Sequence, residues 1–210
     1  QNTITIDAIT EGISTGEADL ILLAPLNISN GGVTSTGGIV SLSGGGQLSG
    51  TGELDLSGST WGLGEDFVKS SGTLTSSQTD LELVDNSTLT SDEGLSFVNL
   101  NLNDFTLTLG SSTSDLTVQN AITIDTSTEG ISTGEADLIL NSALTMSYGL
   151  LDSTGGTWVL GGDFVKSSGT LTTSQTNLEL AGSSITLTSD EGLGFVNLNL
   201  DNYTLTLGSS

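Results

Sequence analysis

Apolar residues alternate with polar ones in short runs along the whole chain. An alternation with a period of two places every second side chain on the same face of a β-strand. Runs of this kind occur at Val98/Leu100/Leu102, Phe105/Leu107/Leu109, Ile4/Ile6, Leu81/Leu83 and Leu178/Leu180. Segments rich in Ser, Gly and Asp separate the runs, and no sustained 3.6-residue period indicates a helix. The pattern predicts an all-β protein.

The chain contains two copies of one long sequence repeat. Three segments recur almost unchanged: 4–22 at 122–140, 66–75 at 163–172 and 89–112 at 187–210. The first offset is 118 residues (122 − 4) and the second is 97 (163 − 66). We interpret residues 1–118 as the first copy and residues 119–210 as the second.

The first copy carries 21 extra residues (118 − 97) between Leu23 and Thr60. A solenoid accommodates such an insertion when it equals one whole coil, because each coil contacts only its neighbours. We therefore predict one continuous parallel β-solenoid, or β-helix, of about 10 coils of about 20 residues. About six coils would belong to the first copy and about five to the second. The crossover rule for parallel strands predicts a right-handed path.

Tandem β-sandwich modules are the alternative architecture, and they would need antiparallel hairpins. In the solenoid, by contrast, the leucines of the alternating runs point inward: Leu100, Leu107, Leu198 and Leu205. Asparagines on stacked coils are expected to form ladders, at Asn99, Asn101, Asn197 and Asn199. Both ends of the chain coincide with repeat boundaries, so we expect it to be an excerpt of a longer array.

The segments 157–180 and 195–210 resemble the Gly-, Ser- and Thr-rich β-helical repeats of very large bacterial surface proteins. Autotransporter passengers and filamentous-haemagglutinin-like adhesins are examples. The resemblance extends over essentially the whole chain and carries no signature motif. It implies secretion, an extracellular location at the cell surface, and a structural role as a spacer, stalk or fibre. The partners would be neighbouring repeats, and the open ends of a solenoid also predict end-to-end self-association.

The composition predicts a folded and strongly acidic protein. Leu, Ile, Val and Phe make up 60 of 210 residues, above the roughly 20% typical of disordered chains. The net charge is -23, and Lys69 and Lys166 are the only basic residues. Two lysines cannot neutralise the phosphates of a nucleic acid or dock the chain on an anionic membrane. No apolar run has the about 18 residues of a membrane helix, so no direct membrane insertion is expected.

Cys and His are absent, which excludes disulfides, thiolate metal sites and catalysis by either residue. Acidic pairs are the remaining candidates for chemistry: Asp92/Glu93, Asp190/Glu191, Glu17/Asp19 and Glu135/Asp137. Ca²⁺ prefers carboxylate and carbonyl oxygens, so these pairs are candidate calcium ligands, with solvated turn carboxylates as the alternative. No calcium-loop motif is present, and we expect no cofactor unless it is Ca²⁺. A polysaccharide-cleaving β-helix enzyme could use such pairs, but each pair is duplicated, so we predict no enzyme.

Trp61 and Trp158 are equivalent in the two copies and are candidate carbohydrate-binding residues, with core packing as the alternative. Lys69 and Lys166 are also equivalent. We expect each to pair with a carboxylate on the next coil, a cross-link or ligand contact being the alternative. Thr-Leu-Thr tripeptides are typical of ice-binding solenoids. Their uneven spacing within one copy argues against that function.

Overall fold

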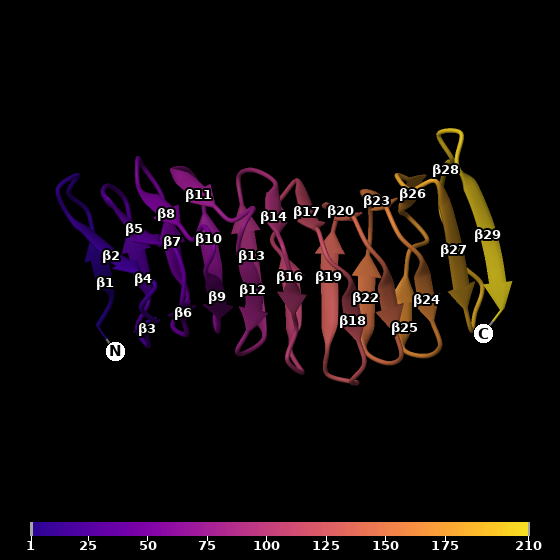
Figure 1. The fold of residues 1–210 in the computed structure, drawn as a ribbon, viewed down its shortest axis with the longest axis horizontal. Coiled ribbons are helices and arrows are strands. Elements are labelled where there is room, and N and C mark those ends of the chain that lie inside the picture. Colours follow the sequence, from indigo (N-terminus) through magenta and orange to yellow (C-terminus); the bar gives the residue numbers. More distant parts are fainter. Residues whose placement is uncertain (1, 210) are drawn as a thin grey trace.

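The computed structural model describes residues 2–209, in which 29 strands and no helix form a parallel β-solenoid of about ten turns of about 20 residues. The turns stack along one axis, and the two ends of the chain lie at opposite ends of an elongated body (Figure 1). Every strand pair in the described residues is parallel. The predicted solenoid is confirmed and the sandwich alternative is wrong. Its handedness stays a prediction.

The strands form five sheets, and the longest runs through most of the body. It has nine strands: β1 (Ile4–Ile6), β4 (Leu26–Ile28), β7 (Gly46–Leu48), β10 (Phe67–Lys69), β13 (Ser87–Ser91), β16 (Thr106–Leu109), β19 (Gly130–Gly134), β22 (Leu150–Ser153) and β25 (Thr170–Thr172). Neighbours in this sheet are three strands apart in chain order, so three strands make one turn.

The other two strands of each turn belong to the four shorter sheets. The four-stranded sheet holds β2 (Gly12–Gly16), β5 (Gly32–Ser35), β8 (Glu53–Asp55) and β11 (Thr73–Thr75). The six-stranded sheet holds β14 (Leu95–Phe97), β17 (Asp115–Val118), β20 (Asp137–Leu140), β23 (Thr157–Leu160), β26 (Asn177–Leu180) and β28 (Leu198–Asn199). One five-stranded sheet holds β3 (Leu20–Leu22), β6 (Ile39–Leu42), β9 (Thr60–Leu63), β12 (Asp80–Leu83) and β15 (Leu100–Asn101). The second holds β18 (Ile122–Ile124), β21 (Leu144–Met146), β24 (Phe164–Lys166), β27 (Ser184–Ser189) and β29 (Thr204–Ser209).

The core consists of the inward residues of all five sheets, stacked in register from turn to turn. Leu81, for example, lies between Trp61 of the preceding turn and Leu100 of the next, and all three are buried. Burial of one such side chain contributes about 1.5–3 kcal/mol. The alternation of apolar and polar residues therefore decides which face of each strand points inward.

Of the leucines predicted to point inward, Leu100 and Leu107 are buried and Leu205 is partly buried against the core. Leu198 lies in register with buried Leu178 and so points to the same side, but it is 53% exposed. In the described residues no strand pairs with the outer edge of β28, so nothing covers this side chain. Its burial would depend on a further turn, which the local pattern does not specify.

The segment between Leu23 and Thr60 is built into the sheets, where it supplies β4 to β8. β10 and β24 have the same Phe-Val-Lys sequence, and they are the tenth strand of the chain and the seventh strand counted from β18. The difference is three strands, which equals one turn. The division of the chain into copies at residues 118 and 119 stays a prediction from the repeat.

Equivalent strands of the two copies lie in different sheets. β1 and its equivalent β18 are 17 strands apart (18 − 1), which is five turns plus two strands. β10 and β24 are 14 apart (24 − 10), which is four turns plus two strands. Two strands are left over after the whole turns in both cases, because the extra segment of the first copy adds one whole turn. The second copy is thus offset from the first by a fraction of a turn around the axis.

Polar contacts between turns occur at two of the four asparagines expected to form ladders. Asn99 Nδ2 donates to Asp80 Oδ1 at 2.7 Å and accepts from Asn120 Nδ2 at 2.9 Å. Asn197 Nδ2 donates to Asn177 Oδ1 at 2.7 Å. The prediction is wrong for Asn101 and Asn199, whose Oδ1 atoms accept local backbone N–H groups two residues further along the chain.

Candidate functional site

The two lysines of the chain occupy core positions. In β10, Phe67 and Lys69 are buried while Val68 is 37% exposed, because alternate side chains of a strand point to opposite sides. Lys69 lies in register with Leu48 of the preceding turn and with Ser91 of the next. Its side chain is only 1% exposed, so its aliphatic part replaces a leucine in the core. Lys166 in β24 is placed in the same way.

The amino group of each lysine reaches two carboxylates on the next turn. Lys69 Nζ donates to Asp92 Oδ1 and lies 3.1 Å from Glu93 Oε1. Lys166 Nζ donates to Asp190 Oδ1 at 2.5 Å and lies 3.0 Å from Glu191 Oε1. We call these the two Lys–carboxylate sites. The expected pairing of each lysine with a carboxylate on the next turn is present in both copies.

Main-chain hydrogen bonds fix the acidic turn against the lysine strand. The backbone N–H of Asp92 donates to the carbonyl oxygen of Lys69 at 3.0 Å. The N–H of Glu93 donates to Ser91 Oγ at 3.2 Å, which closes the turn around a buried serine. In the second copy the same bonds join Asp190 to Lys166 at 3.1 Å and Glu191 to Ser189 at 3.2 Å. The Ser-Asp-Glu sequence thus presents two carboxylates to one buried ammonium group.

The electrostatics of these sites favour the ion pair. Burial lowers the pKa of Lys69, but the hydrogen bonds and negative charges of Asp92 and Glu93 raise it, and the net result lies above the ordinary value of 10.5. The same opposing effects act on Lys166, and its pKa is also raised above 10.5. The hydrogen bond from Lys69 holds the pKa of Asp92 below its ordinary value of 3.8. Both lysines are therefore protonated at neutral pH. A protonated ammonium group is neither a nucleophile nor a base.

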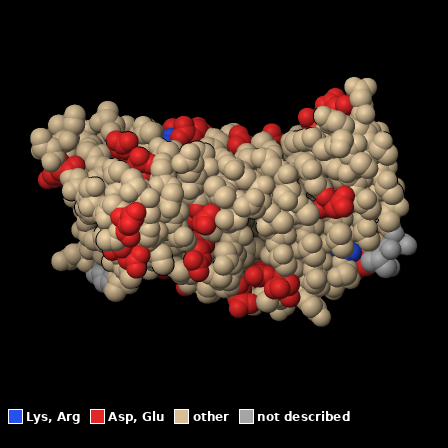
Figure 2. All heavy atoms as spheres, in the orientation of Figure 1, with Lys and Arg blue, Asp and Glu red and all other residues tan. Residues whose placement is uncertain are grey.

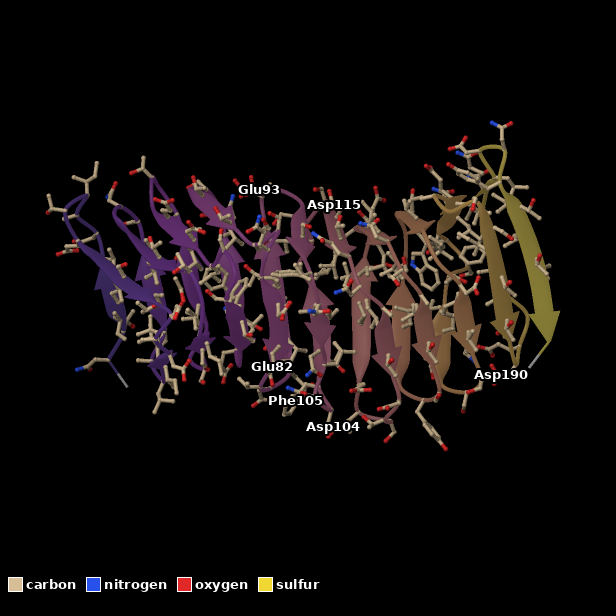
Figure 3. The ribbon with its side chains drawn as sticks, in the orientation of Figure 1. Glu82, Glu93, Asp104, Phe105, Asp115 and Asp190 are labelled. Atoms are coloured by element: carbon tan, nitrogen blue, oxygen red, sulfur yellow. The ribbon has the colours of Figure 1, made fainter. Side chains whose placement is uncertain are left out.

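The candidate calcium ligands lie on separate parts of the body. Figure 3 shows Glu93 at the upper edge and Asp190 near the lower edge, so the two Lys–carboxylate sites are far from each other in that view. Asp19 Oδ1 accepts the N–H of Ile39 at 2.9 Å, and Asp137 Oδ1 accepts that of Thr157 at 2.7 Å. Within residues 2–209, no group of three or more Asp or Glu side chains is arranged to hold a metal ion.

Glu17 and Glu135 each lie along a glycine of the next turn. A Cβ atom built on Gly37 or Gly155 would be 3.3 Å from the Cγ of the glutamate in question. A larger residue at these glycines would therefore crowd the glutamate. Figure 2 shows the acidic residues scattered over the visible face instead of gathered in one patch. The arrangement separates like charges along the body.

Trp61 and Trp158 lie in the core, where both are fully buried. The ring of Trp61 meets Phe67 edge to face at a centroid distance of 5.1 Å and an interplanar angle of 85°. Trp158 lies 5.8 Å from Phe164 and 5.8 Å from Phe195. These positions correspond to the core-packing alternative, because neither indole presents a face on which a sugar could stack.

The sequence analysis missed the burial of Lys69 and Lys166. The signal was present, because Phe67 and Lys69 have the two-residue spacing of side chains on one face of a strand. Apolar Val68 between them obscured this alternation, since it points outward. A lysine two residues after a core phenylalanine is therefore a useful indication of a buried cation.

No protein-family model, curated protein or solved structure matches this chain. In the part of the chain that the structure describes, no helix could span a membrane.

Proposed function

We propose that this chain is a stiff structural segment, a spacer or stalk of an extracellular repeat protein, and that its parent is a bacterial cell-surface adhesin or fibre. One observation carries the proposal. The only lysine of each copy is buried and paired with carboxylates of the next turn, so the residue best suited to chemistry holds turns together. The resemblance to β-helical surface repeats supports the secreted location.

The stacking of the turns accounts for stiffness. Each turn is joined to the next by parallel ladders of backbone hydrogen bonds and by a core that continues through the body. Bending such a body would stretch ladders on one side and compress core side chains on the other. Strands of neighbouring turns are about 4.8 Å apart, so about ten turns span roughly 50 Å. A long array of such copies would hold a terminal domain at a fixed distance from its anchor.

The positions of the acidic and aromatic residues support a role without catalysis or a bound cofactor. Asp92, Glu93, Asp190 and Glu191 face lysines, whereas Asp19 and Asp137 bind backbone N–H groups. Both tryptophans contribute to the core. Each of these features occurs in both copies, as expected of parts that build a shaft. We therefore propose that the chain is not an enzyme.

Small-angle X-ray scattering tests the proposal, with the data extrapolated to zero protein concentration. We expect an elongated particle with a long dimension of about 50 Å. A matched control lacks Gly32–Gly52, which is one turn, and should be shorter by about 4.8 Å. A compact particle, or one whose length does not respond to the deletion, would contradict the stiff shaft.

A binding screen tests the spacer role separately. The unmodified chain is applied to an array of glycans and assayed for release of sugars from polysaccharides. We expect neither saturable binding nor turnover. Saturable binding to one carbohydrate would make the chain an adhesive module, and turnover that is lost in an acidic-pair variant would make it an enzyme.

A further inference from the structure

The C-terminal end of the solenoid presents an apolar surface whose counterpart in the middle of the chain is covered. Leu198 is 53% exposed and Leu207 is 74% exposed. Their sequence equivalents in the first copy, Leu100 and Leu109, are 7% and 5% exposed. Around these leucines lies an open cavity of about 410 Å³, lined by Leu178, Leu187, Leu193, Phe195 and Leu205 among others. We call this surface the C-terminal face.

The N-terminal end shows the matching difference. Ile4, Ile13 and Leu20 of the first turn are only partly buried. Their equivalents in the second copy are Ile122, Ile131 and Leu138, which are almost completely buried. We call the surface formed by the first turn the N-terminal face. The same residues are thus seen once with a turn stacked on them and once without.

The junction between the two copies shows what covers each face. There β16 pairs with β19, with Thr106 opposite Gly130, Leu107 opposite Ile131 and Thr108 opposite Ser132. The N–H of Gly130 donates to the carbonyl oxygen of Phe105 at 3.2 Å, and Thr106 Oγ1 donates to the carbonyl oxygen of Thr128 at 3.1 Å. The end of one copy therefore receives the beginning of the next.

We infer that the C-terminal face of one 210-residue chain binds the N-terminal face of a second copy, so that this segment assembles head to tail. β29 of one copy would then pair with β2 of the other. Transfer of the internal register places Thr204 opposite Gly12, Leu205 opposite Ile13 and Thr206 opposite Ser14. This inference adds a self-association mode to the proposed spacer function and does not depend on it.

One turn on each face already has the geometry that its equivalent has at the internal junction. Glu11 Oε2 accepts the N–H groups of Asp7 and Ala8 at 2.9 and 3.2 Å. Its equivalent Glu129 makes the same two bonds at 2.7 and 3.2 Å, to Asp125 and Thr126. Little conformational entropy would therefore be lost when the N-terminal face docks.

The turn that precedes β29 is preformed in the same manner. Asp201 and Asn202 have φ angles of 44° and 69°, and their equivalents Asn103 and Asp104 have 49° and 69°. Asn and Asp adopt this left-handed conformation more readily than other residues that carry a side chain. The backbone that would receive Gly12 thus already has the geometry found at the internal junction.

One strand position would stay open in the assembly. Residues 113–118 include β17, which pairs with β14 on one side and β20 on the other. The 210-residue sequence contains no second copy of this Thr-Ser-Asp-Leu-Thr-Val segment, and no strand forms at residues 193–195, the counterpart of β14. An extension of the C-terminus by these six residues should complete the contact and tighten the association.

The experiment is sedimentation velocity over a range of concentrations at about 0.15 M salt, where the Debye length is about 8 Å and repulsion between acidic copies is reduced. We expect the unmodified chain to form linear oligomers, and the six-residue extension to strengthen them. Ile13→Lys alters only the N-terminal face and Leu207→Lys only the C-terminal face. Each should weaken association by about tenfold or more, because a charge would enter an apolar contact. Val165→Lys, on the outward side of β24, is the matched control and should not weaken it.

A mixture of the two face variants gives the decisive measurement. Ile13→Lys keeps an intact C-terminal face and Leu207→Lys keeps an intact N-terminal face. The mixture should therefore form one-to-one dimers and nothing longer. A monomeric unmodified chain at all concentrations would overturn the inference, and so would oligomers that persist in either single variant. Neither result would change the particle length or the glycan screen that test the spacer function.

Discussion

Lys166 and Asp190 are 24 residues apart in the sequence, yet their side chains meet at 2.5 Å because one turn of the solenoid separates them. Lys69 and Asp92 are 23 residues apart and make the same contact in the first copy. The lysine of each contact is buried while its carboxylate partner is partly exposed. This asymmetry between the two members of the pair leads to the first prediction.

Removal of the carboxylates should destabilise the fold more than removal of the lysine. Asp92→Asn combined with Glu93→Gln leaves a buried ammonium group without a counter-charge, which is the costly case. Lys69→Met keeps an unbranched apolar chain in the core and leaves two carboxylates that water can reach. Urea unfolding should give a lower midpoint for the double acidic variant than for Lys69→Met. The reverse order would show that the ammonium group is well hydrated in the folded protein.

The stabilising effect of these pairs should disappear at both extremes of pH. The folded-state pKa of Lys69 is raised, so its contribution is fully present below the ordinary value of 10.5 and is lost as pH rises through the folded value. The folded-state pKa of Asp92 is lowered, so its contribution is present above 3.8 and is lost as pH falls through the folded value. The part of the unfolding free energy that this pair contributes should therefore decline above about pH 10.5 and below about pH 3.8.

Lys69→Met is the control for that pH series, because the variant lacks the ammonium group and retains every carboxylate. The difference in unfolding free energy between the unmodified chain and this variant should be constant between the two limits and should change outside them. A difference that varies near neutral pH would mean that another group titrates with Lys69.

A core leucine should matter more in the middle of the solenoid than at its end. Leu107→Ala removes a fully buried side chain and should cost about 2–5 kcal/mol. Leu205→Ala makes the same chemical change at the equivalent position, where the side chain is only partly buried, and should cost less than half as much. Thr108→Ala, on the outward side of β16, is the control for the strand itself. Equal costs for the two leucines in thermal melts would contradict the assignment of Leu107 to a covered core position.

Deletion of one whole turn should be tolerated, whereas deletion of half a turn should not. Removal of Gly32–Gly52 brings Gly12 opposite Glu53 and keeps every remaining strand in its sheet. Removal of Gly32–Ser41 alone takes out β5 and most of β6, so the strands that follow would meet the wrong sheets. Circular dichroism and cooperative melting should be retained in the first variant and lost in the second. A half-turn variant that still melts cooperatively would argue against register as the constraint.

Cations should stabilise the fold by screening, because the net charge is -23. Mg²⁺ and Ca²⁺ at equal concentration should raise the melting temperature by similar amounts, and NaCl at matched ionic strength should have much of the same effect. A rise specific to Ca²⁺ would instead indicate a calcium site at the acidic pairs. The variant Asp92→Asn with Glu93→Gln would then show whether that site includes the first Lys–carboxylate site.

The architecture could be predicted from the sequence because the information is local and repeated. Alternation at residues 98–109 gives strands, and an insertion of one turn between Leu23 and Thr60 is readily accommodated by a stack of coils. The exposure of Leu198 could not be predicted, since it depends on which strand lies beyond β28. Which carboxylates pair with Lys69 could not be predicted from the sequence either, because the exact length of the turn decides which acidic side chains lie next to the lysine.

The position of Trp61 is an intermediate case. Trp61 and Leu63 are two residues apart and both point inward, so the alternation alone would have placed the indole in the core. Aromatic residues are also common in sugar-binding sites, and this chemical association competed with the geometric argument. In a chain whose strands are this regular, spacing is the better guide to where a side chain lies.

The displacement of equivalent strands between sheets determines how an array of such copies would display any feature of the repeat. Lys69 and Lys166 are separated by 14 strands, or four turns plus two strands, which corresponds to roughly 22 Å along the axis. Because two strands remain after the whole turns, each copy points its Ser-Asp-Glu turn in a new direction, and the fourth copy points the same way as the first. Ligands bound at successive copies would lie on a helical path around the axis, so that bulky ligands on neighbouring copies would be kept apart. A strictly in-phase repeat would crowd the same ligands along one side.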